Sequence, residues 1–388
     1  PYSRSFEATI LKVFGSYVVL DKTAFYPEGG GQPSDTGLLM FNGGSTRVIS
    51  VIKSGNVILH KVEDSSTLKR GMKVKGVIDW ERRLSLMRHH TGTHILLEAC
   101  KRVLGDHVRQ AGAQKGPDQS RLDIAHYKPI TEDELANIEI EANRAVLANI
   151  PVITRWIERD KAESMYGFDI YQGGVVPGVK LRIVEIKGYN IQACGGTHVN
   201  NTAEIGFIKI IGVERVQDGV ERIRFCAGEK ALEYVQKQEK LLKEASSLLA
   251  TEPSKIAEAV KKLIEERKRL KKEIERLQEK LGKEKAEEYK GVKIIVEDEL
   301  ATQAIRELTK EKTVVISASK KGKNALLTIA CSDDLPLDCA KIAKEIGTKF
   351  GKGGGGRKTI GQAGIEINKI EEAKKEVKKM VKKGLEES

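Results

Sequence analysis

The pattern of hydrophobic and polar positions changes several times along the chain. From Phe6 to about Trp80, short stretches alternate apolar and polar residues and are separated by turn residues. Alternation with a period of two is typical of strands with one buried face, and many short strands at this spacing favour a small antiparallel barrel. The expected strands are Phe6–Leu11, Ser16–Leu20, Arg47–Val51, Val57–His60 and Lys73–Ile78.

From Asp79 to Gly228 the pattern becomes mixed. Leu86, His90, Thr93, His94 and Leu97 recur at helical spacing. A second helix is expected from a capping box, in which Thr131 and Glu134 satisfy free N–H groups at the start of a helix that runs to about Ala148. Further strands are expected at residues 121–127, 152–156, 181–186, 207–211 and 221–225. Together they predict an α/β domain.

Residues Glu229 to Lys290 are rich in Lys and Glu, with leucines at helical intervals. Thr251-Glu252-Pro253-Ser254 interrupts the run, so two helices folded back as a hairpin are expected. In the second helix one apolar row recurs every seven residues, at Ile256, Leu263, Leu270 and Leu277. Such a seam can be shared by two helices, either within one chain or in a dimer.

The last segment predicts a small α/β domain, with strands at residues 292–296, 313–317 and 325–330, and helices beginning near Asp338 and Ile370. The predicted architecture is therefore a multidomain α+β chain in four parts. These are a small antiparallel β-barrel at residues 1–80, an α/β domain at 81–228, a helical hairpin or coiled coil at 229–290, and a small α/β C-terminal globular domain at 291–388.

Composition adds a partner class. The chain has 388 residues and a formal net charge of +12, which favours an anionic partner such as nucleic acid. Five widely spaced cysteines do not form a disulfide framework and indicate a reducing, cytoplasmic location. No apolar run is long enough to span a membrane. The chain begins with Pro1, which suggests a processed chain or a piece of a longer protein.

Two short motifs predict a metal site. His90 and His94 lie one helical turn apart on one face, whereas His89 points away from that face. In the second motif Cys194 and His198 are separated by Gly-Gly-Thr, and the glycines allow a turn tight enough for both side chains to converge. Three imidazoles and a thiolate suit Zn²⁺, so we expect the two motifs to share one zinc ion.

Two glycine runs could bind a ligand through the backbone. Gly29-Gly30-Gly31 follows a proline turn, where it could expose N–H groups or simply connect a hairpin. The second run comprises Gly353, Gly354, Gly355 and Gly356, between Lys352 and the pair Arg357 and Lys358. We expect a mobile, amide-rich loop that could follow a phosphate backbone, with an ordinary flexible surface loop as the alternative.

With these motifs identified, the sequence resembles the editing and C-terminal parts of alanyl-tRNA synthetases and the free-standing deacylases related to them. The resemblance covers essentially the whole chain. It is carried by motifs that occur in the family's order: Thr23 to Pro33, His90-Thr91-Gly92-Thr93-His94, Gln110-Ala111-Gly112, Cys194-Gly195-Gly196-Thr197-His198 with Asn201 to Gly206, and the glycine run ending at Arg357.

The resemblance implies hydrolysis of mischarged tRNA(Ala), chiefly seryl-tRNA(Ala) and also glycyl-tRNA(Ala). His90, His94, Cys194 and His198 match the family's zinc ligands, and Thr23 and Gln32 match positions that line its amino-acid pocket. Cys194 is also expected to be essential for hydrolysis. The C-terminal part, including Lys352 to Lys358, would bind the outer corner of tRNA, and the helical segment could support a homodimer. The adenylation motifs of a complete synthetase are absent, so this piece is not expected to activate alanine.

Other readings remain open at this point. The chain could be a tRNA-binding and dimerisation module with a purely structural zinc, or a complete free-standing deacylase rather than part of a synthetase. A phosphodiesterase related through the C-terminal domain is disfavoured, because Arg88 stands where its metal motif would need an aspartate. Four protein ligands usually indicate a structural zinc, whereas a catalytic zinc keeps one open position. The sequence does not choose between these roles.

Overall fold

The computed structural model describes residues 1–172, 174, 176, 178–322 and 324–387. The chain divides into two compact units, Pro1–Leu242 and Lys243–Ser388. The chain contains both helices and strands, as the predicted α+β class requires.

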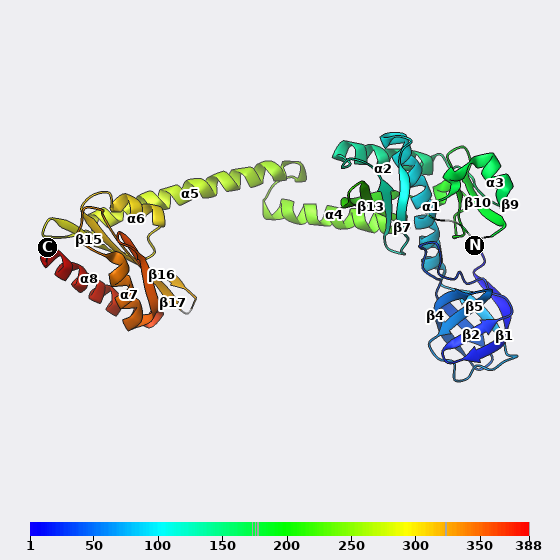
Figure 1. Cartoon of the computed structure of the whole chain (residues 1–388), viewed down its shortest axis with the longest axis horizontal. Coiled ribbons are helices and arrows are strands. Elements are labelled where there is room, and N and C mark those ends of the chain that lie inside the picture. Colours follow the sequence, from blue (N-terminus) through cyan, green and yellow to red (C-terminus); the bar gives the residue numbers. More distant parts are fainter. Residues whose placement is uncertain (173, 175, 177, 323, 388) are drawn as a thin grey trace. The chain divides into compact units, whose positions relative to one another are not determined.

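The first unit begins with a closed antiparallel barrel whose strand order is β1-β2-β5-β4-β3-β6 (Figure 1). Its strands are β1 (Ser5–Phe14), β2 (Tyr17–Leu20), β3 (Gly37–Phe41), β4 (Gly44–Ser54), β5 (Val57–Val62) and β6 (Lys73–Ile78). The inward positions form an apolar core that includes Ile10, Val18 and Leu39. The predicted barrel is therefore present, although the sequence analysis did not identify β3.

Helix α1 (Trp80–Leu104) follows the barrel directly and crosses the core of the rest of this unit. The Asp79 side chain accepts a hydrogen bond from the backbone N–H of Arg82 and caps the helix N-terminus. All residues from His89 to Leu97 are buried, on every side of the helix, because sheets and loops surround this stretch. A helix covered all round can hold polar side chains only if they have partners or a function.

Two antiparallel sheets and several short helices surround α1. One sheet has the order β12-β13-β8-β7, and the other has the order β11-β10-β9. Their strands are β7 (Arg109–Gln114), β8 (Ser120–Ala125), β9 (Val152–Glu158), β10 (Lys180–Ile186), β11 (Asn190–Ala193), β12 (Ile208–Gln217) and β13 (Val220–Ala227). The helices are α2 (Glu132–Leu147), α3 (Arg159–Tyr166) and the 3-10 turns Phe168–Ile170 and Thr202–Ile205. The predicted capping box of α2 is present, with Thr131 and Glu134 in the expected roles.

Two helices form the lysine- and glutamate-rich segment. They are α4 (Glu229–Leu248) and α5 (Ile256–Glu284), and the 3-10 turn Pro253–Lys255 separates them near the predicted break. Along α5 the side chains of Leu263, Leu270 and Leu277 are about half exposed. A partner helix for this apolar row, in the same chain or in a second copy, therefore stays a prediction.

The second unit contains a six-stranded sheet with the order β14-β15-β16-β17-β19-β18. Its strands are β14 (Glu287–Tyr289), β15 (Val292–Val296), β16 (Thr313–Lys321), β17 (Asn324–Cys331), β18 (Gly351–Arg357) and β19 (Ile360–Glu366). Only β15 and β16 pair in parallel, and the other neighbours are antiparallel. The helices are α6 (Thr302–Leu308), α7 (Cys339–Phe350) and α8 (Ile370–Glu386), with the 3-10 turn Ile367–Lys369 before α8.

The second glycine run is not the loop that the sequence analysis expected. Residues Gly351–Arg357 form the edge strand β18, paired with β19. A Cβ atom on Gly354 would lie 2.2 Å from the carbonyl oxygen of Ala343, and one on Gly347 would lie 2.2 Å from the carbonyl carbon of Gly353. Helix α7 therefore packs directly on the backbone of β18, and at least two of these glycines are needed for close packing.

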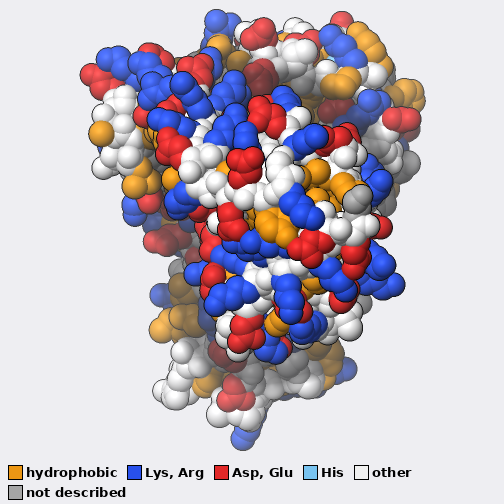
Figure 2. Space-filling model, turned by 90° about the vertical axis from the view of Figure 1, so that its left-hand side faces the viewer, with side chains coloured by type: hydrophobic (Ala, Val, Ile, Leu, Met, Phe, Trp, Pro, Cys, Tyr) orange, Lys and Arg blue, Asp and Glu red, His pale blue; other side chains and the backbone are white. Residues whose placement is uncertain are grey.

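The exposed surface carries charges of both signs. In the space-filling view, Lys and Arg side chains are interspersed with Asp and Glu, and smaller hydrophobic areas lie between them (Figure 2). Within the described part of the chain, no helix combines the length and the apolar character needed to cross a bilayer.

Candidate metal centre

Helix α1 supplies the first two side chains of the site. His90 and His94 are both buried, and their ring centroids lie 5.5 Å apart. His89 belongs to a different face of the helix: its Nδ1 atom lies 2.9 Å from the Ser85 carbonyl oxygen, and its Nε2 atom accepts a hydrogen bond from the backbone N–H of Ala227. The imidazole of His89 therefore has a structural partner at each nitrogen.

The turn that follows β11 supplies the other two side chains. The guanidinium of Arg182 donates hydrogen bonds to the carbonyl oxygens of Cys194 and Gly196, at 2.7 and 2.8 Å, and so holds this turn. A Cβ atom at position 196 would lie 2.0 Å from Cε1 of His90. Only glycine allows the turn to approach helix α1 this closely, which explains one of the two glycines of the motif.

The structure brings together the four residues that the sequence analysis selected. Their ligand atoms all lie within 4.8 Å of one another. The Sγ atom of Cys194 is 3.2 Å from Nε2 of His90 and 3.4 Å from Nε2 of His198. Sulfur and nitrogen ligands on a tetrahedral zinc ion are separated by roughly 3.5 Å, given bonds of about 2.3 and 2.0 Å. The spacing of these donor atoms fits such an ion.

Neighbouring groups fix the tautomers of two imidazoles. Nδ1 of His90 lies 2.7 Å from the amide oxygen of Gln32, which can only accept, so the His90 proton must be on Nδ1. Nδ1 of His198 lies 3.1 Å from the hydroxyl of Thr91, which already donates its proton to the Met87 carbonyl. Both rings therefore present the lone pair of Nε2 to Cys194, the state that a metal ligand requires.

His94 is held less firmly. Its Nε2 atom lies 3.4 Å from the amide nitrogen of Gln172. Its buried Nδ1 atom has no hydrogen-bond partner among the described residues. Of the three histidines, His94 therefore has the weakest support from surrounding groups.

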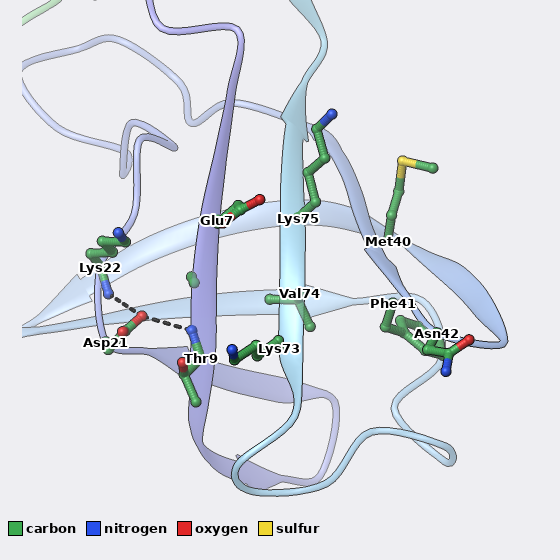
Figure 3. A pocket seen from close by; sticks show the side chains of 11 residues that line it. Glu7, Thr9, Asp21, Lys22, Met40, Phe41, Asn42, Lys73, Val74 and Lys75 are labelled. Atoms are coloured by element: carbon green, nitrogen blue, oxygen red, sulfur yellow. Dashed lines mark hydrogen bonds between the residues drawn. The ribbon is translucent and has the colours of Figure 1, made fainter.

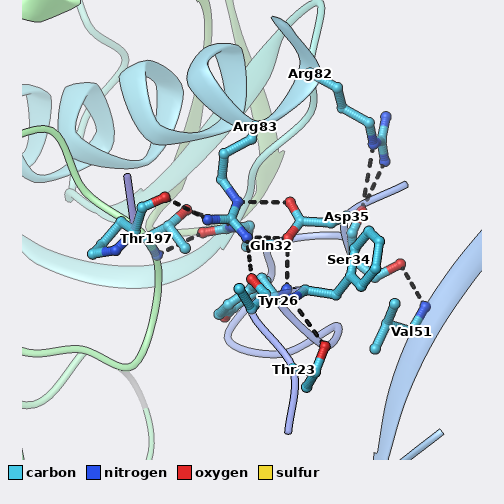
Figure 4. Close-up of polar contacts among 12 residues, drawn as sticks. Thr23, Tyr26, Gln32, Ser34, Asp35, Val51, Arg82, Arg83 and Thr197 are labelled. Atoms are coloured by element: carbon cyan, nitrogen blue, oxygen red, sulfur yellow. Dashed lines mark hydrogen bonds and ion pairs between the residues drawn. The ribbon is translucent and has the colours of Figure 1, made fainter. Parts of the chain in front are cut away.

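The first glycine run joins the barrel to the metal centre. Gln32 is buried, donates from Nε2 to the Thr197 hydroxyl at 2.8 Å and accepts from the Thr197 backbone N–H at 3.1 Å (Figure 4). The same segment is attached to α1 by the buried ion pair of Arg83 and Asp35, with Nε and Oδ1 2.8 Å apart. These contacts explain why the run has a defined conformation and is more than a hairpin connection.

Burial controls the protonation of the cluster. It lowers the pKa of His90 and His198 well below the ordinary value and lowers the pKa of His94 to about 3. Burial also raises the pKa of the Cys194 thiol, while the Gly196 N–H group and the cations Lys115 and Arg182 act in the opposite direction. The imidazoles are thus neutral and available as ligands, and a divalent cation would favour the thiolate.

Thr23 lies within the barrel and is already engaged there. Its hydroxyl oxygen accepts a hydrogen bond from the Phe25 backbone N–H at 3.1 Å and lies 2.8 Å from Nε2 of the buried His60. The described contacts of this hydroxyl are thus with the barrel. His60 itself is buried in the barrel.

A separate hollow lies in the barrel. It has a volume of about 620 Å³ and is lined mainly by residues of β1, β3 and β6, including Glu7, Lys73 and Lys75 (Figure 3). Neither Gln32 nor Thr23 lines it. This hollow is therefore separate from the His–Cys cluster.

Sequence reasoning did not identify the residues that support the cluster. They come from five segments. Thr91 and Gln172 contact ligand imidazoles, Arg182 bonds to the Cys194 carbonyl, and Thr197 and Lys115 bond to the segment that carries Gln32. The two threonines stand inside the recognised motifs, so their position was a usable signal. No pattern in the sequence marks Lys115, Arg182 or Gln172.

Three family models match the chain. The one described as tRNA synthetases class II (A) matches residues 2–82, and the Threonyl and Alanyl tRNA synthetase second additional domain matches residues 181–224. The DHHA1 domain matches residues 287–383. The chain is 45% identical over 394 residues to the alanine–tRNA ligase of Pyrococcus abyssi and 48% identical over 395 residues to that of Thermococcus kodakarensis, with 98% of the chain aligned in each case.

Over 98% of its length the chain is similar to alanyl-tRNA synthetases. It spans 43% of the length of both of these ligases. Among solved structures, the C-Ala domain of alanyl-tRNA synthetase from Aquifex aeolicus is 27% identical, with a TM-score of 0.22, and the match covers 25% of this chain and 98% of that one. The match to the second additional domain includes Arg182, Cys194 and His198, so half of the cluster lies in the segment that this family shares.

Proposed function

We propose that this part of an alanyl-tRNA synthetase hydrolyses the ester of mischarged tRNA(Ala), chiefly seryl-tRNA(Ala) and also glycyl-tRNA(Ala). The observation that carries the proposal is the cluster of His90, His94, Cys194 and His198, buried and with tautomers set for metal binding. The match to the second additional domain of threonyl- and alanyl-tRNA synthetases supports it.

A second site is needed because serine differs from alanine by one hydroxyl group. A pocket shaped for alanine can exclude serine only about 10²-fold, whereas a site that hydrogen-bonds the hydroxyl can discriminate by about 10⁴-fold or more. Hydrolysis adds water to the ester carbonyl and releases the amino acid and the ribose hydroxyl of the tRNA. Such a site therefore corrects an error that the first pocket cannot avoid.

We assign Zn²⁺ to the cluster, with His90, His94, Cys194 and His198 as ligands. When bound, zinc supplies a Lewis acid that can polarise an ester carbonyl or activate water. The protein contributes the rest: Gln32 and Thr91 orient two imidazoles, and Arg182 holds the turn that carries Cys194. Because His94 has the weakest support, we propose it as the ligand position that adjusts when substrate binds.

Recognition of serine is assigned to Thr23 or Gln32, as the family resemblance implies. Gln32 already bonds to His90 and Thr197, and Thr23 to His60 and Phe25, so each could contact serine only by sharing or exchanging a hydrogen bond. The test is Thr23→Val: a loss of preference for the seryl over the alanyl ester supports Thr23. An unchanged preference would clear Thr23 of this role and leave Gln32.

The C-terminal unit is proposed to bind the outer corner of tRNA. Lys352, Arg357 and Lys358 are exposed on and beside the edge strand β18. Contacts of this kind go to phosphates and weaken with salt. The seam of α5 could support a homodimer, and the four-part division at residues 80, 228 and 290 remains our proposal for the domains.

The decisive experiment measures deacylation of seryl-, glycyl- and alanyl-tRNA(Ala), with and without a chelator. We expect the seryl ester to be hydrolysed and the alanyl ester to be spared, with activity lost on chelation and restored by Zn²⁺. Zinc content and tRNA binding without turnover would instead support a binding module with a structural zinc. Activity that survives complete metal removal would exclude a catalytic role for zinc.

A further inference from the structure

Lys115 is a buried cation beside the metal centre. It follows the last residue of β7, and its side chain is only 3% exposed. Among the described residues, no ion pair joins it to a carboxylate, whereas the equally buried Arg83 is paired with Asp35. An uncompensated buried charge is costly, and a methionine would fill a similar space without that cost. The cost of burying this charge indicates that the ammonium group of Lys115 has a specific role.

Its contacts point to the glycine run of the barrel. The Lys115 ammonium donates a hydrogen bond to the Gly30 carbonyl at 3.1 Å, and the Lys115 backbone N–H donates to the Gly31 carbonyl at 2.7 Å. Gly31 has φ +72°, and a Cβ atom there would lie 2.4 Å from the Ala113 carbonyl oxygen. The Gly29–Gly31 run thus packs closely against the end of β7, and the hydrogen bond from the Lys115 ammonium helps to hold it in this position.

Gln32, the residue that orients His90, directly follows Gly31 in the sequence. Gly30 and Gly31 both have positive φ, so the segment has wide conformational freedom unless its carbonyls are held. Gln32 must keep its amide oxygen 2.7 Å from Nδ1 of His90 to fix the tautomer. A shift of about 1 Å in the run would break that hydrogen bond.

We propose that Lys115 is a positioning residue of the metal centre, whose ammonium group holds Gly30 so that Gln32 orients His90. Lys115 acts through Gln32 and does not itself bind the metal. The effect on metal binding rests on the proposed zinc site, while the effect on the glycine run does not.

The first test needs no metal. Hydrogen exchange is measured on the peptide that contains Gly29 to Gln32 in the metal-free chain, for the wild type, Lys115→Met, Lys115→Arg and, as a control, Lys61→Met on the exposed barrel surface. We expect exchange in this peptide to rise about tenfold in Lys115→Met, because a local opening becomes easier. Lys115→Arg should restore most of the protection, since it keeps a donor. Unchanged exchange in Lys115→Met would overturn the proposal.

The second test measures Zn²⁺ affinity by competition with a chelator, and the absorption spectrum of the Co²⁺-loaded chain. Lys115→Met should bind zinc about tenfold more weakly and change the cobalt spectrum in the same way as Gln32→Ala. The double variant should lose no more affinity than Gln32→Ala alone, because both changes remove one interaction. Additive losses would show that Lys115 does not act through Gln32.

The two tests separate the possible failures. If the wild-type chain does not bind zinc, the proposed metal function fails, and the exchange experiment still decides whether Lys115 holds the glycine run. If zinc binds and Lys115→Met changes neither exchange nor affinity, only the inference about Lys115 fails. A circular dichroism spectrum and melting temperature equal to those of Lys61→Met show that Lys115→Met has folded.

Discussion

The amide oxygen of Gln32 lies 2.7 Å from Nδ1 of His90, and this contact joins the barrel to helix α1. Gln32 comes from the segment between β2 and β3, whereas His90 belongs to α1. The four ligands lie beyond the domain boundary predicted near residue 80, and this contact crosses that boundary. The site depends on both sides of this boundary, so variants in the barrel should affect metal binding without changing any ligand.

Gln32→Leu tests this dependence. It removes the acceptor that fixes the His90 tautomer, and we expect Zn²⁺ affinity to fall about 10- to 100-fold with the ligands intact. Gln32→Glu keeps an acceptor and should retain more affinity. Competition with a chromophoric chelator gives both values. Equal zinc affinity in Gln32→Leu and the wild type would show that the orientation of His90 does not depend on this contact.

Cys194→Ala should abolish both zinc binding and hydrolysis of seryl-tRNA(Ala). The Sγ atom of Cys194 contacts the imidazoles of His90 and His198, so its loss opens the cluster on one side. Cys226→Ala is the matched control, because Cys226 is a buried free thiol on β13 outside the cluster. Metal content by atomic emission and deacylation rates check the result. Full activity in Cys194→Ala would remove this residue from the mechanism.

The three histidines should differ in their contribution to zinc affinity. His90 and His198 have a partner at Nδ1, whereas Nδ1 of His94 has none among the described residues. A side chain that is less firmly oriented contributes less to the free energy of zinc binding, because it loses more conformational freedom when the metal binds. His94→Ala should therefore weaken zinc binding less than His90→Ala or His198→Ala. The reverse order in chelator competition would contradict the role proposed for His94.

The sequence predicted the parts of the structure that local patterns determine. The helix with His90 and His94, the capping box of Thr131 and five of the six barrel strands follow from period and turn residues within a few positions. The convergence of Cys194 with the helix came from the donor types, because three imidazoles and a thiolate suit one metal. Local chemistry and periodicity were sufficient for these features.

Other features depend on contacts between distant segments. The Gly353–Gly356 segment was expected to be a mobile loop because glycine is flexible, but α7 packs on its backbone and makes it a strand. Lys115 carries no signal of burial in its sequence neighbourhood, since its partner Gly30 is 85 residues away. Strand β7 was missed for a similar reason: its short alternation includes Gly112, which is poor evidence for a strand.

Stability should fall on acidification because His89 is buried and neutral. Burial lowers the pKa of His89 to about 4 from an ordinary value of 6.5, so the unfolded chain binds a proton more readily between these values. The stabilisation is complete above pH 6.5 and is lost progressively as the pH falls to 4. The full effect amounts to about 3 kcal/mol.

Urea unfolding in the presence of a chelator, at several pH values, measures this loss. His89→Gln keeps a group near Ser85 and Ala227 but cannot bind a proton, so its unfolding free energy should depend less on pH in the same window. The buried histidines of the cluster add to the dependence in both proteins. The same pH dependence in His89→Gln and the wild type would show that His89 is not responsible.

Gly354→Ala tests why the second glycine run forms a packed strand and not a loop. A Cβ atom there would lie 2.2 Å from the Ala343 carbonyl oxygen of α7, so the helix and the edge strand must separate. We expect a loss of about 2 kcal/mol or more in the stability of the C-terminal unit, in line with overpacking against rigid neighbours. Gly355→Ala is the matched control, because no atom lies within 4 Å of its added Cβ, and it should be close to neutral. Chemical denaturation monitored by circular dichroism compares the two. If both variants were equally stable, close packing of α7 on β18 would not be the reason for glycine at position 354.

The same pair of variants tests the role of this strand in tRNA binding. Lys352, Arg357 and Lys358 lie on and beside β18, so Gly354→Ala should also weaken tRNA binding and Gly355→Ala should not.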